Sequence, residues 1–212
     1  MEHAFWHNIW ATNEIGFHET NPNALLQSHL STIAQSPHSR IFLPLCGKTG
    51  DIGWLLSLGY AVVGAELSEL AIRQLFEELA LTPEISEHGQ LKRYAAEKLV
   101  IWVGDIFTLT AEQLDYVDAI YDRAAIVALP AEMRIAYSQH LITLTKHAPQ
   151  LIVTYEYDQP DYPGPPFSIS EQEIYAHYRN AYQITQLAHE KVPGGLKGLF
   201  PATTSAWQLL PS

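Results

Sequence analysis

Residues 40–76 read RIFLPLCGKTGDIGWLLSLGYAVVGAELSELAIRQLF and alternate between apolar runs and turn residues. Residues 41–45 form a β-like run that ends at a glycine-containing loop, and residues 61–65 form a second buried strand with Glu66 at its carboxyl end. A short helix, which we expect Asp51 to cap, lies between them. A glycine turn after one strand and a carboxylate after the next, about 20 residues apart, is how α/β folds hold a nucleoside.

Three kinds of ligand site share this layout: a P-loop for a nucleotide, a dinucleotide site and a site for S-adenosylmethionine. The loop after the first strand argues against the first two. A P-loop needs a glycine five residues before Gly47, where Phe42 stands, and a dinucleotide site needs G-x-G-x-x-G, whereas the next glycines are Gly50 and Gly53. S-adenosylmethionine carries no phosphate, so it needs only backbone groups near Gly47 for its amino-acid tail and a carboxylate, Glu66, for its ribose hydroxyls. In isolation Glu66 is at least as well explained as a solvated strand-end carboxylate, and the βαβ spacing favours the cofactor.

The composition fits one cytoplasmic domain that acts on a small molecule. The chain has 212 residues, 47% of them hydrophobic, and we expect residues 1–212 to form a single domain. Its formal net charge is −11 at pH 7 and it has no basic cluster, which argues against nucleic acid and anionic membranes as partners. The single cysteine, Cys46, indicates a reducing cytoplasm, and we expect neither a signal peptide nor a membrane span.

Strand and helix patterns alternate through the rest of the chain, which predicts a doubly wound α/β fold with a mostly parallel sheet and helices on both faces. The pattern indicates further strands at 99–103, 117–121 and 151–157, helices beginning at Pro130 and after Ser170, and a closing antiparallel pair at 182–189 and 206–210.

Ligands bind beyond the carboxyl ends of the strands in such a sheet. Asp105 is placed there to meet an adenine amino group and Ile106 to pack on the ring, although aspartate is also common in ordinary turns. Arg123 follows the next strand and is suited to hold an anionic acceptor; the alternative is a surface salt bridge with Asp122 or Glu132. Pro166 belongs to a proline-rich loop that is either a rigid turn or one wall of the acceptor pocket. The ten histidines form no metal-binding motif, so we expect no metal site.

Six segments of the chain together resemble one family. They read PLCGKTGDIGWL, GYAVVGAELSELAI, GDIFTL, IYDRAAIVALPAEMR, YEYDQ and GPPFSI. In this order, along residues 6–178, they strongly resemble the bacterial thiopurine S-methyltransferases. The resemblance implies a class I, Rossmann-like methyltransferase fold. For such a fold we expect a seven-stranded sheet, with residues 1–38 as a helical cover over a core of residues 39–212.

The resemblance also implies cofactor and substrate contacts. S-adenosylmethionine is the implied cofactor, with contacts at Trp10, Leu45, Glu66 and Arg123 and with the segment 105–106 at the adenine. Phe17 is implied near the acceptor. Family members methylate aromatic and heterocyclic thiols, bacterial relatives are linked to selenium and tellurium compounds, and a monomer is suggested. The chain departs from the family at residues 191–205, so the resemblance implies no substrate contact from that segment.

We therefore expect a methyltransferase that acts on the sulfur of small thiols, with Arg123 as the catalytic residue. A thiol of low pKa is largely thiolate near neutral pH, so catalysis would depend on positioning rather than on a strong general base. One alternative is detoxification of selenium or tellurium compounds by the same chemistry, and another is a non-catalytic protein that binds S-adenosylmethionine. A dinucleotide oxidoreductase is the weakest alternative, because the glycine pattern is missing.

Overall fold

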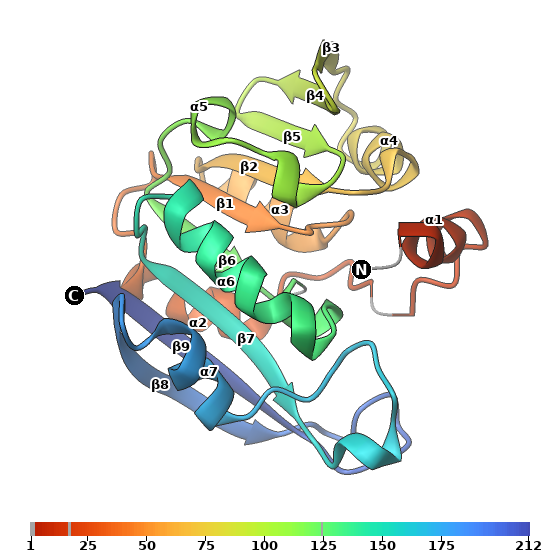
Figure 1. The fold of residues 1–212 in the computed structure, drawn as a ribbon. Helices are drawn as coiled ribbons and strands as arrows, with labels where there is room; N and C mark the ends of the chain where they lie inside the picture. The colour runs from red at the N-terminus through yellow and green to blue at the C-terminus, as the bar shows by residue number, and fades with distance from the viewer. Residues whose placement is uncertain (1–2, 17, 124) are drawn as a thin grey trace.

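A computed structural model describes residues 3–16, 18–123 and 125–212 of the chain. Within these ranges the strands are β1 (Arg40–Pro44), β2 (Ala61–Glu66), β3 (Glu84–His88), β4 (Leu91–Ala96), β5 (Leu99–Val103), β6 (Ala119–Asp122), β7 (Gln150–Glu156), β8 (Tyr182–Lys191) and β9 (Thr203–Pro211). They form one nine-stranded sheet in the order β3-β4-β5-β2-β1-β6-β7-β9-β8 (Figure 1).

The middle of the sheet is parallel and both edges are antiparallel. Strands β5, β2, β1, β6 and β7 run parallel, while the β3-β4 and β8-β9 hairpins join the sheet antiparallel at its two ends. The predicted α/β class and the closing antiparallel pair are confirmed, and the predicted seven strands become nine in the described residues. The additional two are β3 and β4, and β3 is mostly exposed and polar, so it lacks the apolar run of a buried strand.

Helices cover both faces of the sheet (Figure 1). The α-helices of the described residues are α1 (His3–Ala11), α2 (Ala24–His29), α3 (Gly50–Ser57), α4 (Glu69–Glu78), α5 (Ala111–Leu114), α6 (Ala131–Leu144) and α7 (Glu171–Tyr178). Side chains alternate along a strand, so Phe42 of β1 joins the core shared with α6, whereas Ile41 and Leu43 join the core shared with α3. None of these helices has the length and apolar run that a bilayer crossing needs.

The start of α3 differs from the predicted one. Thr49, rather than Asp51, caps this helix, and its hydroxyl accepts a hydrogen bond from the Asp51 backbone N–H at 3.4 Å. Asp51 lies in the first turn instead, where a carboxylate also suits the helix dipole. Its buried carboxylate accepts from the backbone N–H of Asn23 at 2.7 Å, so the side chain joins α3 to the start of α2.

The N-terminal helix lies beside the carboxyl ends of the central strands (Figure 1). Trp10 of α1 is buried, and its ring lies so close to the loop after β1 that a Cβ on Gly47 would stand 3.0 Å from Trp10 Cζ2. This contact brings α1 over the sheet edge where the ligand was expected. The division of the chain at residue 38 into a cover and a core stays a prediction.

Candidate active site

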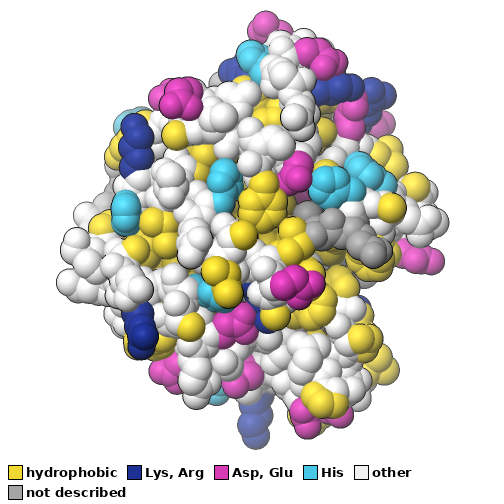
Figure 2. Space-filling view, in the orientation of Figure 1, with side chains coloured by type: hydrophobic (Ala, Val, Ile, Leu, Met, Phe, Trp, Pro, Cys, Tyr) yellow, Lys and Arg dark blue, Asp and Glu magenta, His cyan; other side chains and the backbone are white. Residues whose placement is uncertain are grey.

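A cavity of about 320 Å³ opens at the carboxyl edge of the sheet. The loop after β1, the end of β2, the residue after β6, the N-terminal segment and two loops from the C-terminal half contribute to it. Its lining residues are Trp6, Trp10, Gly16, His18, Glu19, Leu45, Cys46, Gly47, Lys48, Thr49, Glu66, Leu67, Arg123, Val127, Ala128, Tyr155, Pro165, Pro166, Val192, Leu196 and Lys197. Figure 2 shows apolar side chains gathered at the right of the visible face, between α1 and the loop after β7.

The carboxylate of Glu66 is built into the floor of this cavity. The backbone N–H of Gly47 donates to Oε2 at 2.8 Å and that of Ser68 donates to Oε1 at 2.8 Å. The residue is 6% exposed, and burial raises the pKa of its carboxyl group above the ordinary value, while the backbone N–H groups oppose that rise. Each oxygen of an ionised carboxylate has further acceptor capacity, so Glu66 retains positions for two hydroxyl donors.

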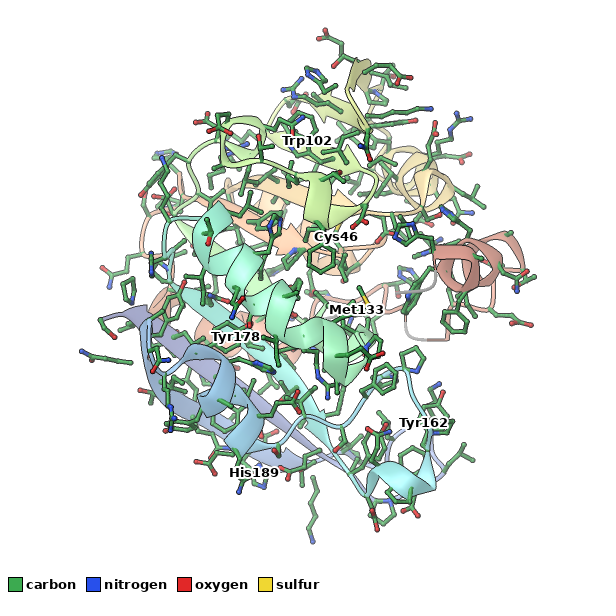
Figure 3. All side chains as sticks on the ribbon, viewed as in Figure 1. Cys46, Trp102, Met133, Tyr162, Tyr178 and His189 are labelled. Carbon is green, nitrogen blue, oxygen red and sulfur yellow. The ribbon has the colours of Figure 1, made fainter. Side chains whose placement is uncertain are left out.

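The loop between β1 and α3 has an unusual backbone that brings it close to Glu66. Leu45 and Gly47 have φ values of 46° and 53°, in the left-handed region, and the N–H of Cys46 donates to the carbonyl oxygen of Ala65 at 3.0 Å. Cys46 lies at the end of β1 (Figure 3), and burial raises the pKa of its thiol well above the usual range. This thiol is therefore protonated and inert near neutral pH, as a small apolar side chain would be.

Arg123 reaches the cavity from the end of β6. Its side chain is 10% exposed, and its Nη2 lies 2.5 Å from Oε1 of Glu19, whose side chain is 50% exposed. The ion pair therefore has one member inside the cavity and one at its mouth. The alternative of a surface salt bridge with Asp122 or Glu132 does not describe Arg123, because its partner is Glu19 and the guanidinium is largely buried and lines the cavity.

The turn that carries Arg123 is held by the side chain before it. Asp122 is fully buried; its Oδ1 accepts from the backbone N–H groups of Ala125 and Ile126, both at 3.2 Å, and its Oδ2 accepts from the Tyr137 hydroxyl at 2.7 Å. Ile126 begins the 3₁₀ turn η3 (Ile126–Ala128), which contributes to the cavity wall. Burial raises the pKa of Asp122 from 3.8 to about 6, although these hydrogen bonds lower it.

We expect Asp122→Asn to change how the free energy of unfolding depends on pH. Because the pKa of Asp122 is raised in the folded state, the protonated group stabilises the fold. This contribution to stability is fully present below the unfolded value of 3.8 and is lost as the pH rises through about 6. The wild type should therefore lose about 2 kcal/mol relative to the variant between about pH 4 and pH 8. Denaturant unfolding at both pH values measures this, and two parallel stability curves would contradict it.

The last two loops form the wall opposite α1. The loop after β7 supplies Pro165 and Pro166, and the segment between β8 and β9 supplies Val192, Leu196 and Lys197. An aromatic cluster of Tyr157, Tyr162 and Phe200 joins the two loops, with ring centroids 5.1–6.4 Å apart. Tyr162 lies in the loop that leaves the end of β7 (Figure 3). Lys197 donates to the Tyr162 hydroxyl, and its Nζ lies 4.4 Å from the centre of that ring.

Six of the nine predicted site residues line this one cavity: Trp10, Leu45, Gly47, Glu66, Arg123 and Pro166. Asp105 and Ile106 are not among the lining residues. Asp105 Oδ1 accepts from the Phe107 N–H at 3.0 Å and Oδ2 lies 3.4 Å from His3 Nε2, while Ile106 is buried in the core. Phe17 lies outside the described residues. The contacts of all nine with ligands stay predictions.

Several lining residues were not predicted; among them Glu19 forms the ion pair with Arg123, and His18 and Tyr155 lie close enough to the pair to interact with its charges. Tyr155 is near the carboxyl end of β7, so the strand-end rule applied to Glu66 would have found it. His18 and Glu19 belong to an irregular segment without periodicity, and no sequence signal locates them. Burial and the nearby Lys48 lower the pKa of His18, so its imidazole is neutral near pH 7.

Comparisons with known proteins find relatives over nearly the whole chain. The family model for thiopurine S-methyltransferase (TPMT) matches residues 1–197. A thiopurine S-methyltransferase of Xanthobacter autotrophicus is 49% identical over 99% of both chains, and one of Teredinibacter turnerae is 48% identical over 99% of this chain and 97% of its own.

Solved structures share the fold at much lower identity. A Burkholderia thailandensis 1,6-didemethyltoxoflavin-N1-methyltransferase with bound S-adenosylhomocysteine has a TM-score of 0.64 at 13% identity, covering 98% of this chain and 87% of its own. Magnesium protoporphyrin IX methyltransferase from Synechocystis, also with S-adenosylhomocysteine, has a TM-score of 0.62 at 13% identity, covering 98% and 99%. The predicted class I methyltransferase fold is thereby confirmed.

Proposed function

The chain belongs to the thiopurine S-methyltransferase family, and from this membership we propose that it methylates small aromatic and heterocyclic thiols on sulfur. It is an S-adenosylmethionine-dependent methyltransferase. The observation that best supports a sulfur acceptor is the largely apolar cavity into which the Arg123 guanidinium projects from the end of β6. A planar ring suits the apolar wall, and a sulfur that carries negative charge suits the cation.

The residues around Glu66 fit S-adenosylmethionine. The two unused acceptor positions on the buried carboxylate match the two hydroxyls of a ribose, and the loop at Gly47 brings backbone groups to the same place. We assign Trp10, Leu45, Gly47 and Glu66 to the cofactor. The segment 105–106 is assigned to the adenine end, as the family resemblance implies.

When bound, S-adenosylmethionine supplies an electrophilic methyl group on a sulfonium centre. Arg123 donates hydrogen bonds to the acceptor sulfur, which favours the thiolate form over the thiol. Pro166 and Val127 line the space for the aromatic ring of the acceptor and exclude water from it. The exclusion of water strengthens the charge interactions inside the cavity. Orientation of this kind contributes several kcal/mol to lowering a barrier, so no strong general base is needed. Phe17, outside the described residues, is also assigned to the acceptor.

Incubation with labelled S-adenosylmethionine and a panel of aromatic and heterocyclic thiols tests this proposal. We expect label to transfer to thiols whose thiolate dominates near neutral pH, and not to the matched phenols. Headspace analysis with selenide and telluride, kept reduced under anaerobic conditions in the same assay, detects volatile dimethyl products and so tests the alternative acceptors. Transfer to no thiol on the panel would contradict the proposal, whatever the headspace result.

We also propose that the protein works as a cytoplasmic monomer. The single cysteine supports a reducing compartment, because a chain with one thiol forms no internal disulfide. Sedimentation of the purified protein tests the oligomeric state, with a mass near 23.8 kDa expected.

A further inference from the structure

The ion pair at the cavity mouth places a donor and an acceptor of hydrogen bonds next to each other. Arg123 Nη2 bonds one carboxylate oxygen of Glu19, at 2.5 Å, and both residues line the cavity. We propose that Glu19 is a specificity-determining residue, which together with Arg123 selects acceptors whose sulfur stands next to a ring N–H. This inference rests on the proposed thiol acceptor and names the class of thiol more narrowly.

The position of Glu19 is set by its backbone. Its carbonyl oxygen accepts from the N–H of Gly50, the first residue of α3, at 3.0 Å. The next residue, Thr20, packs against Gly50 even more closely. A Cβ on Gly50 would lie 2.0 Å from the carbonyl oxygen of Thr20. Any side chain at position 50 would therefore clash with this segment. The absence of a side chain on Gly50 is what lets Glu19 lie over the cavity.

The chemistry of the pair matches a cyclic thioamide. Glu19 uses Oε1 for Arg123, and a carboxylate has a second oxygen that accepts but never donates when ionised. A guanidinium donates and never accepts. Side by side, they present one donor and one acceptor to the cavity. A ring with C=S next to N–H presents the complementary acceptor and donor, whereas a thiol on a hydrocarbon ring offers only the sulfur.

The neighbouring charges do not duplicate this arrangement. The Nζ atom of Lys48 lies 2.6 Å from Oε1 of Glu78, so this ammonium group forms its ion pair with Glu78. The Glu66 carboxylate is held by the backbone N–H groups of Gly47 and Ser68. Among the described lining residues, Glu19 is thus the carboxylate that stands beside Arg123, and the pair as a whole is neutral. Because the Glu19 carboxylate offsets the charge of Arg123, a ring that carries no negative group besides its sulfur suits this pair.

Pyridine-2-thione and thiophenol provide matched probes, because both are six-membered rings with one sulfur and they differ in the ring N–H. We expect Glu19→Gln to lower kcat/KM for pyridine-2-thione by about tenfold or more and to leave thiophenol within about twofold. The amide oxygen of the variant accepts from Arg123, so its NH₂ group faces the ring N–H. Two donors then face each other and the hydrogen bond to the ring is lost. Glu19→Ala should show the same preference, since it removes the acceptor altogether.

Calorimetry with S-adenosylhomocysteine present gives a second readout that does not depend on turnover. The affinity for pyridine-2-thione should fall in both variants and the affinity for thiophenol should not. Glu14→Gln is the control: it also removes one carboxylate charge, at an exposed position of the same N-terminal segment. This variant should match the wild type. Thermal unfolding establishes that each variant is folded.

Equal losses for the two probes would overturn the proposal, because Glu19 would then merely hold Arg123 in place. No loss for pyridine-2-thione would overturn it as well. If the wild type methylates neither probe nor any other thiol, the proposed function fails, and the calorimetric comparison still decides whether Glu19 reads the ring N–H.

Discussion

Replacing Glu66 with alanine is expected to weaken the binding of S-adenosylhomocysteine by about 1–3 kcal/mol, or roughly 5- to 150-fold. The carboxylate is buried and already accepts the N–H groups of Gly47 and Ser68. Its removal leaves those two donors unsatisfied and takes away the acceptors for the ribose hydroxyls. The loop at Gly47 also loses the side chain that connects it to β2, so we expect the loop to move.

Titration calorimetry measures this effect, and Glu77→Gln, an exposed change on α4, serves as the control. Glu66→Gln is informative because it keeps the shape of the side chain. One of its two terminal atoms becomes an NH₂ group facing a backbone N–H, so its affinity should also fall. Wild-type affinity in Glu66→Ala would remove this residue from the cofactor site.

Arg123→Ala is expected to lower kcat for thiol methylation by about 100-fold, while the affinity for S-adenosylhomocysteine changes much less. In the proposed site the guanidinium stabilises negative charge on the acceptor sulfur inside a largely apolar cavity, where a charge interaction is stronger than in water. The alanine variant removes that stabilisation and leaves the Glu19 carboxylate without its cation. The thiol should then be harder to ionise when it is bound.

Steady-state kinetics with one thiol, together with calorimetry for the cofactor product, separates these two quantities. Arg73→Ala is the control, because Arg73 forms an exposed pair with Glu69 on α4. Arg123→Lys should recover only part of the activity, since an ammonium cannot reproduce the planar fork of a guanidinium. Equal losses in turnover and in cofactor affinity would indicate that Arg123 serves binding alone.

The strand ends were predictable because they obey local rules. The apolar run before Cys46 and the spacing to Glu66 need only the periodicity of strands and the geometry of a βαβ unit. The β3-β4 hairpin was not predictable in this way, because the exposed side chains of β3 carry no apolar pattern and its place in the sheet comes from pairing through β4 with β5. Asp51 shows the same limit, since its partner Asn23 is 28 residues away.

The sequence by itself determined the α/β class, the loop and carboxylate suited to a nucleoside without phosphate, and the family, because each depends on residues close together in the chain or on motifs read in order. Only the tertiary structure decided that Glu19 meets Arg123, that Gly47 lies under Trp10, and that the segment around Leu196 walls the cavity. These contacts join residues far apart in the sequence. Their existence depends on how loops without periodicity pack over a sheet edge, and no local pattern encodes that packing.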